Sequence, residues 1–166
     1  DASTSSDESM NAVSEIRKIG GKQCFVSGMT AFVEDLKELA EKEEINLNLE
    51  ALNITTDHVG NFLKNTQMAA EIIRLIGSPK LRILYDAYHM QLNEGKICDT
   101  IREYIDTIGH IHIADAPGRH EPGTGEICYK NVMNVLKELN YTGVVGCELF
   151  PKTDTKTAVP AIMEIF

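Results

Sequence analysis

Apolar residues along this chain follow two different spacings. Some stretches of about 10–15 residues place them three and four positions apart, which is typical of one buried helix face. Between these stretches lie short, continuous apolar runs, which are typical of strands buried on both faces. The spacing predicts helices over residues 10–19, 31–42, 68–76, 98–108 and 131–140, with a short helix after Thr157. The runs predict strands over residues 24–27, 45–52, 81–85, 108–114 and 144–150.

Capping and turn residues mark several of the predicted boundaries. We expect Thr30 to cap the second helix, and Gly77, with Pro79 beyond it, to end the third. Residues 1–9 are rich in Ser and Asp, a composition that disfavours a packed core. We therefore expect residues 1–20 to be a leader or a partial helical segment outside the main domain.

Strands that alternate with helices indicate βαβ units, and therefore a parallel sheet of the α/β class. The pattern contains about five such units, without sequence identity between them. A closed (β/α)8 barrel typically needs around 250 residues, whereas this chain has 166. The sequence therefore predicts parallel β/α units of a TIM-type barrel, in a chain too short to close that barrel alone.

The negative charge of the chain disfavours nucleic acid and anionic membranes as partners. Sixteen basic and 25 acidic side chains give a net charge of −9, whereas tight binding to nucleic acid needs clustered Lys and Arg. The same charge disfavours an anionic membrane surface, and no apolar run approaches the roughly 20 residues of a membrane span. The N-terminus, DASTSSDESM, has neither the basic nor the apolar region of a signal peptide. We expect a cytoplasmic protein that binds neither nucleic acid nor membrane.

The cysteines lie far apart and form no C-x-x-C pair, so the sequence predicts neither a zinc knuckle nor a redox motif. All of them have apolar neighbours: Cys24, Cys98, Cys128 and Cys147. We expect small, buried thiols in a reducing compartment.

Polar side chains occur at the carboxyl ends of four successive predicted strands. They are Glu50 in NLNLEALN, Asp86 in ILYDAYH, His112 in HIHIAD and Glu148 in VVGCELF. Ligands of parallel α/β folds bind at this end of the sheet. Three carboxylates and one imidazole form a donor set that suits Mg, Mn, Co or Zn.

Each of these residues also has an ordinary structural interpretation. A single Glu at a strand end is usually solvated, and a single His usually bonds to the backbone. Four such residues in the same strand-end position favour a shared site, because buried charges without partners are too costly to recur by accident. The sequence therefore predicts a divalent metal site at the carboxyl edge of the sheet.

Two further residues are candidates for substrate binding. His89 follows Asp86 by three positions and could bind a substrate oxygen or a second metal, although an ordinary loop histidine is the alternative. Arg119 lies in the Gly- and Pro-rich loop DAPGRHEPGTGE, where it could clamp a carboxylate through two hydrogen bonds. Its alternative interpretation is an ordinary surface arginine.

Three more polar residues accompany these candidates. His110 precedes His112 on the same predicted strand, and we expect His112 to point inward and His110 to point towards the helix layer. His120 follows Arg119 in a loop of the kind that usually contacts substrate. We expect the neighbouring Glu121 to be solvated.

Four segments resemble the xylose isomerase-like TIM-barrel superfamily in order and spacing: NLNLEALN, YDAYHMQLNEG, IGHIHIADAPGRHEPGTGEI and YTGVVGCELFP. Within it they are most similar to the hydroxypyruvate isomerases and the ketose 3-epimerases. The resemblance extends over roughly residues 22–151. It rests on the combination of segments, because no single segment is specific.

The resemblance implies roles for particular residues. Four positions match the metal ligands of related ketose epimerases: Glu50, Asp86, His112 and Glu148. Glu50 and Glu148 match the acid–base pair that faces across the substrate, and His89 and Arg119 match substrate-binding positions. Many hydroxypyruvate isomerases have Gln where this chain has His112, so at this position the chain is more similar to the metal-dependent epimerases.

The resemblance covers only about the last five of the eight β/α units of a barrel. It implies that residues 21–166 are the C-terminal part of a barrel domain. The segment between Ser27 and Ala31 is also shorter than the usual loop of the family. Either the N-terminal units lie outside the given sequence, or the chain pairs with another copy. An open edge strand near Cys24 would favour such a homo-oligomer.

For function, we expect a sugar or hydroxy-carbonyl isomerase or epimerase. The metal would hold the carbonyl oxygen and the adjacent hydroxyl oxygen of a small substrate, and would stabilise the enediolate formed when a proton leaves. One of Glu50 and Glu148 would remove that proton and the other would return it. The sequence does not assign the two roles.

Two alternatives stay open. The strand-end Glu, the D-x-x-H pair and the Arg-His loop also resemble the abasic-site endonucleases of the same superfamily. This resemblance implies a metal-dependent nuclease that uses three zinc ions. This chain has Gly118 where those enzymes have Asp before Arg-His, and its charge is −9, so the nuclease ranks below the isomerase. The second alternative is an inactive fragment of a barrel.

Overall fold

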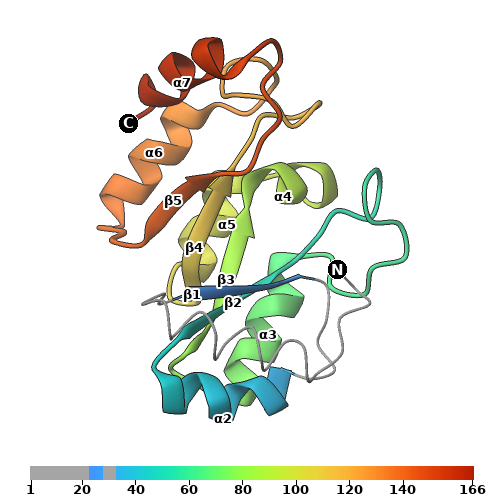
Figure 1. Cartoon of the computed structure of the whole chain (residues 1–166), viewed down its shortest axis with the longest axis vertical. Coiled ribbons are helices and arrows are strands. Elements are labelled where there is room, and N and C mark those ends of the chain that lie inside the picture. The colour runs from blue at the N-terminus through green and yellow to red at the C-terminus, as the bar shows by residue number, and fades with distance from the viewer. Residues whose placement is uncertain (1–22, 28–32) are drawn as a thin grey trace.

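The computed structural model describes residues 23–27 and 33–166, in which strands and helices alternate (Figure 1). The strands are β1 (Gln23–Ser27), β2 (Asn46–Glu50), β3 (Leu81–Asp86), β4 (Ile108–Ile113) and β5 (Val144–Cys147). The helices are α2 (Val33–Glu43), α3 (Thr66–Ile76), α4 (Ala87–Asn93), α5 (Ile97–Tyr104), α6 (Tyr129–Glu138) and α7 (Thr155–Met163). The predicted leader, the predicted first helix and the cap at Thr30 lie outside the described residues.

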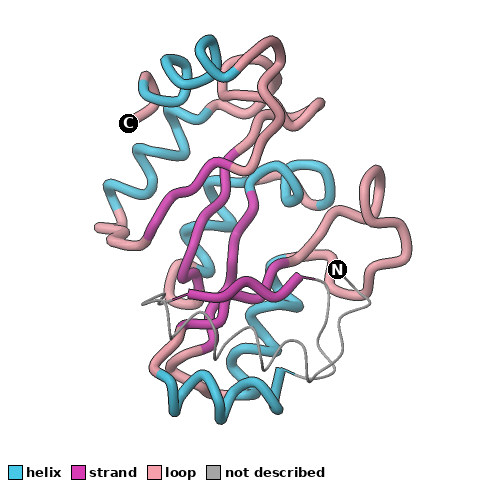
Figure 2. The backbone as a smooth tube through the Cα atoms, in the orientation of Figure 1, coloured by secondary structure: helices cyan, strands magenta, loops and turns pink. Residues whose placement is uncertain are grey.

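The strands of the described chain form one parallel sheet. Each strand pairs with the next along the chain, in the order β1-β2-β3-β4-β5, so β1 and β5 form the edges of this sheet. Helical connections carry the chain from the end of one strand to the start of the next (Figure 2). The predicted α/β class is confirmed, and the connectivity is that of consecutive units of a TIM-type barrel.

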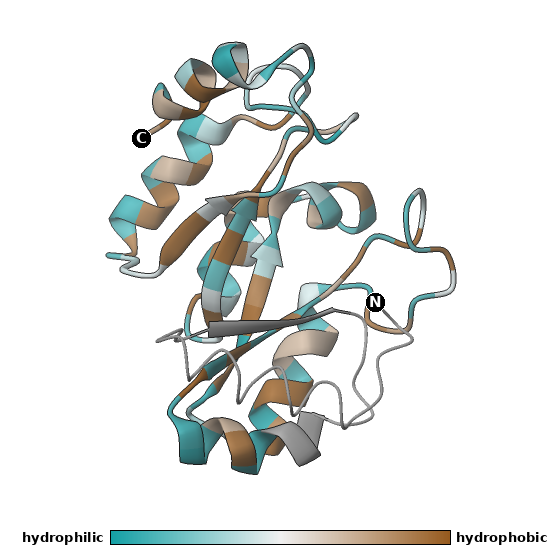
Figure 3. Cartoon of the chain, viewed as in Figure 1, coloured by the Kyte–Doolittle hydropathy of each residue, from teal (hydrophilic) through white to brown (hydrophobic). Residues whose placement is uncertain are grey.

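Alternate strand residues build the core between the sheet and its helices. The fully buried side chains of this layer include Leu47, Leu49, Ile83, Tyr85 and Ile111. Helix α3 packs against β3 and α2 packs against β2. Apolar and polar stretches alternate along α3 and α6, as Figure 3 shows, because only one face of each helix is covered. The remaining strand residues point to the other side of the sheet, away from this layer.

Helix α3 shows how local sequence sets the boundaries. Its first turn is capped by Asn65, whose side chain accepts a hydrogen bond from the backbone N–H of Met68 at 2.9 Å. Its end is Gly77, which adopts the left-handed conformation with φ of 66°. The predicted end at Gly77 is confirmed. The predicted start is two residues late, because the apolar spacing begins only after the capping turn.

Helix α4 is not predicted by the apolar spacing. It starts directly after β3, because the Asp86 side chain accepts hydrogen bonds from the backbone N–H groups of Tyr88 at 2.8 Å and His89 at 3.3 Å. Asp86 is therefore both the last residue of a strand and the cap of a helix. His89 lies on this helix with 1% of its surface exposed, not in a loop.

The expectation of buried cysteines is wrong for those whose side chains the structure describes. Cys98 is half-buried, whereas Cys128 and Cys147 are exposed. Cys147 lies on the edge strand β5, where Val144 is 51% exposed as well. Apolar neighbours in the sequence do not imply burial on an edge strand, because no further strand covers it in the described chain.

No helix within residues 33–166 combines the length and the apolar character that crossing a membrane requires.

Candidate functional site

Four successive strand ends bring the predicted metal-binding side chains together. Glu50 ends β2 and Asp86 ends β3, while His112 lies near the end of β4 and Glu148 directly follows β5. In the sheet register Asp86 is the partner of His112. Each of the four side chains offers one ligand atom, and these atoms all lie within 4.8 Å of one another. Because the strands are parallel, residues at the ends of four neighbouring strands lie together and form a single cluster.

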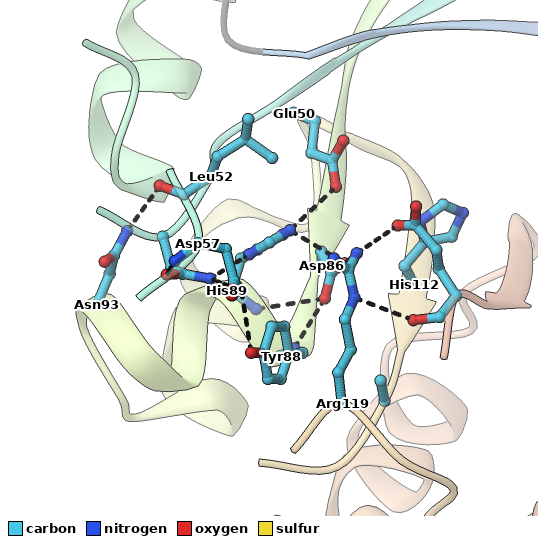
Figure 4. A network of polar contacts seen from close by, with 12 residues as sticks. Glu50, Leu52, Asp57, Asp86, Tyr88, His89, Asn93, His112 and Arg119 are labelled. Carbon is cyan, nitrogen blue, oxygen red and sulfur yellow. Dashed lines mark hydrogen bonds and ion pairs between the residues drawn. The ribbon is translucent and has the colours of Figure 1, made fainter. Parts of the chain in front are cut away.

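Arg119 lies within this cluster and balances part of its negative charge. Its Nη2 donates to Glu148 Oε2 at 2.8 Å and to Asp86 Oδ2 at 3.4 Å. The Glu148 carboxylate also contacts His112 Nδ1 at 3.1 Å. Figure 4 shows Arg119 reaching towards Asp86 and His112 from the loop below them. The arginine therefore joins two carboxylates that would otherwise repel each other.

The two carboxyl groups joined by Arg119 have opposite pKa shifts. Burial raises the pKa of Asp86 to about 6, although the Arg119 charge opposes this. The hydrogen bond from His112 lowers the pKa of Glu148 to about 2, with the Arg119 charge adding to it. Burial would lower the pKa of His112, but the hydrogen bond and the nearby carboxylates outweigh it and raise that pKa. Separated pKa values of this kind are typical of acid–base sites.

His89 faces the two most buried carboxylates of the cluster. Its Nε2 lies 3.9 Å from Glu50 Oε1 and 3.8 Å from Asp86 Oδ2. Burial lowers the pKa of His89 to about 4, and the Arg119 charge lowers it further. The ring is therefore neutral near pH 7, and its contacts with the carboxylates are not ion pairs.

The loop that carries Arg119 is organised by Asp115, which the sequence analysis missed. This fully buried carboxylate accepts backbone N–H groups at 2.8–3.0 Å. The donors are Ala116, Gly123, Gly125 and Ile127. The signal in the sequence is an Asp at a strand end before a loop with several glycines, which supply unhindered N–H groups. Arg119 is thus held on a fixed loop.

The expectations for His110 and Glu121 are wrong. His110 does not point away from His112; their ring centroids lie 4.9 Å apart, because residues i and i+2 of a strand share one face. Glu121 is buried, and its carboxylate accepts the backbone N–H of Lys152 at 2.9 Å. His120 contacts the Phe150 carbonyl through Nδ1 at 2.7 Å and thereby links two loops, and its contact with substrate stays a prediction.

Comparison with known proteins identifies the fold family. The family model described as xylose isomerase-like TIM barrel matches residues 16–165. The chain belongs to the xylose isomerase-like TIM-barrel family. Hydroxypyruvate isomerase of Escherichia coli is 42% identical over 76% of this chain and 50% of its own length. A 2-oxo-tetronate isomerase of Cupriavidus necator is 34% identical over 72% of the chain and 46% of its length. The chain therefore spans about half the length of the curated relatives it matches.

Solved structures of other proteins share this fold. A crystal structure of a family 2 AP endonuclease from Brucella melitensis superposes with a TM-score of 0.85 at 24% identity, covering 95% of this chain and 66% of that one. A D-psicose 3-epimerase superposes with a TM-score of 0.73 at 22% identity, covering 92% and 58%. These two likenesses show the fold of the chain.

Proposed function

We propose that this chain carries the site of a divalent-metal-dependent isomerase or epimerase acting on small hydroxy-carbonyl compounds or ketoses. The observation that carries the proposal is the cluster of four ligand atoms within 4.8 Å, supplied by four successive strand ends. The curated relatives support the reaction class, because their names are hydroxypyruvate isomerase and 2-oxo-tetronate isomerase.

The donor set fits a hard or borderline divalent cation such as Mg, Mn, Co or Zn. The ligands would be Glu50, Asp86, His112 and Glu148. Asp86 supports the fit, because a carboxyl group whose burial raises its pKa gains most from a nearby positive charge. When bound, the ion would supply the charge that stabilises an oxyanion next to the reacting carbon. A structural neighbour is described as IolI protein with a bound zinc atom.

Glu50 and Glu148 are the proposed proton-transfer pair. Glu148 is half-exposed and its pKa is lowered to about 2, so it is a carboxylate near pH 7 and can accept a proton. Glu50 is 5% exposed and lies across the cluster on a different strand. A proton removed at one face of a carbon could thus be returned at the other face or to the neighbouring carbon.

Arg119 and His89 are the proposed substrate-binding residues. Arg119 already donates to the carboxylates of the cluster, so its guanidinium lies within reach of an oxygen held there. The ring of Tyr88 supports the guanidinium at 5.2 Å. His89 presents Nε2 between Glu50 and Asp86. Together they place hydrogen-bond donors at two points of the cluster: Arg119 beside Glu148 and Asp86, and His89 beside Glu50 and Asp86.

We propose residues 21–166 as the C-terminal part of a barrel domain, since the chain spans about half of its curated relatives. A homo-oligomer is proposed as well, because both β1 and β5 are edges of the described sheet and Val144 and Phe150 are exposed. Nucleic acid and membranes are not proposed as partners, because the charge of −9 disfavours both.

Proton exchange tests the proposed function directly. In D2O with Mn²⁺ and hydroxypyruvate as the probe, the chain should catalyse exchange of the substrate C–H with deuterium, followed by NMR. Glu50→Gln should abolish this exchange while its circular dichroism stays unchanged. Glu138→Gln is the matched control, because Glu138 lies exposed on α6 in a surface pair with Arg102. Exchange that persists in Glu50→Gln would contradict the role of Glu50, and no exchange in the unaltered chain would contradict an active site within it.

A further inference from the structure

The side of His89 turned away from the carboxylates contacts a second polar network, formed by Asn53, Asp57 and Tyr88. Asn53 Nδ2 lies 2.7 Å from His89 Nδ1, and both groups are buried. A neutral imidazole carries its proton on either Nδ1 or Nε2, and its partners decide which. Whether Asn53 presents its amide oxygen or its NH2 group at this contact therefore determines whether Nε2 of His89 carries a proton.

The Asn53 amide has only one consistent orientation. Its Oδ1 accepts the backbone N–H groups of Thr56 at 3.1 Å and Asp57 at 3.0 Å. An amide nitrogen in that place would confront two donors, so the oxygen must be there. The NH2 group then points the other way, and its two hydrogens serve Asp57 Oδ2 at 2.8 Å and His89 Nδ1 at 2.7 Å.

The tautomer of His89 follows from this orientation. An amide NH2 group donates and does not accept, so His89 Nδ1 must be the acceptor. The proton of the neutral ring then lies on Nε2, the atom that faces Glu50 and Asp86. At 3.9 and 3.8 Å both carboxylate oxygens lie beyond hydrogen-bond distance, so neither of them takes up this N–H.

The same network reaches Arg119. Asp57 Oδ2 accepts the Asn53 amide and also the Tyr88 hydroxyl at 2.9 Å. The Tyr88 ring in turn lies under the Arg119 guanidinium, 5.2 Å from its centre. Figure 4 shows Asp57, Tyr88 and His89 on one side of Asp86 and Arg119 on the other. One buried amide and one carboxylate thus orient both donors proposed for substrate binding.

We propose that Asn53 is a positioning residue that fixes His89 as its Nε2–H tautomer, so that the ring donates a hydrogen bond into the cluster and is not a further metal ligand. That the acceptor is a substrate oxygen rests on the proposed function. The tautomer itself does not, because it follows from the contacts of Asn53 alone.

Imidazole ¹⁵N NMR tests the tautomer without substrate or metal. In the full chain with ¹⁵N-labelled histidine near pH 7.5, long-range ¹H–¹⁵N correlation should show His89 with Nε2 protonated and Nδ1 bare, with the resonances assigned by their loss in His89→Gln. Asn53→Asp replaces the donor with an acceptor, so Nδ1 of His89 should become protonated. Asn61→Asp is the matched control, because it is the same substitution in the same loop, and the Asn61 side chain donates to the Leu63 carbonyl and makes no described contact with His89.

Each outcome decides the proposal. An Nδ1–H tautomer in the unaltered chain would overturn it, and this measurement stands even where Asn53→Asp does not fold. A bare Nδ1 that persists in folded Asn53→Asp would also overturn it, because Asn53 would then not control the ring. Neither result bears on whether Glu50, Asp86, His112 and Glu148 bind a metal, which bound-metal analysis measures separately.

Discussion

At the residue scale, two carboxyl groups of the cluster lie in different surroundings. Asp86 is buried and has a raised pKa, whereas Glu148 is half-exposed and has a lowered one. Arg119 contacts both. The Arg119 guanidinium between these two carboxylates offsets their repulsion, and it would compete with a bound metal ion for the same oxygens.

Arg119→Met should therefore have two opposite effects. The metal-free chain should lose about 1–2 kcal/mol of unfolding free energy, because Asp86 keeps a buried charge without its cation, while the exposure of Glu148 limits the loss. The stabilisation by Mn²⁺ should become larger, because no guanidinium competes with it. Thermal unfolding with and without Mn²⁺ measures both, and Arg102→Met on the exposed face of α5 serves as control. A smaller Mn²⁺ effect in Arg119→Met would argue against the competition.

The residue types at the strand ends could be predicted from the sequence, because a charge at the end of an apolar run is visible there. The partners of those residues could not. The contacts of Asn53 with His89 and of Tyr88 with Asp57 join residues more than 30 positions apart. The prediction that His110 and His112 point to opposite sides of the sheet is wrong for a different reason, because residues two positions apart on a strand share a face.

At the element scale, the loop between β4 and α6 does most to position Arg119. Asp115 gathers four backbone N–H groups of that loop. Gly125 comes so close that a Cβ there would lie 2.2 Å from the Ala116 carbonyl oxygen. The loop therefore has little freedom, and the arginine it carries has a fixed approach to the cluster. Apolar spacing gave no sign of this, because the loop is organised by hydrogen bonds.

Asp115→Asn should loosen this loop. The amide offers one acceptor where the carboxylate offered two, and its NH2 group would face backbone donors, so we expect a loss of about 2–3 kcal/mol in unfolding free energy. Urea unfolding followed by circular dichroism measures the loss. Asp106→Asn is the matched control, because Asp106 is exposed and pairs with Arg74 at 3.5 Å; it should change the free energy by less than about 1 kcal/mol. Equal losses in the two variants would contradict the role of Asp115.

At the scale of the whole molecule, the parallel order of the sheet was predictable, because helices and strands alternate in the sequence and crossovers between neighbouring parallel strands are short. The exposure of β5 was not predictable from the sequence, because the exposure of an edge strand depends on what lies beside it. The same parallel order explains the site: four carboxyl ends in register must bring their last side chains to one place.

The number of divalent ions bound per chain tests the central claim most directly. The chain, freed of metal and then resupplied with Mn²⁺, Mg²⁺, Co²⁺ or Zn²⁺, should retain about one ion after desalting, as measured by elemental analysis. Glu148→Gln should lose that ion while it remains folded, and Glu138→Gln should keep it. About three zinc ions per chain would favour the abasic-site nuclease instead. No retained ion in a folded chain would contradict the account, because the four strand-end side chains would then lie together without forming a metal site.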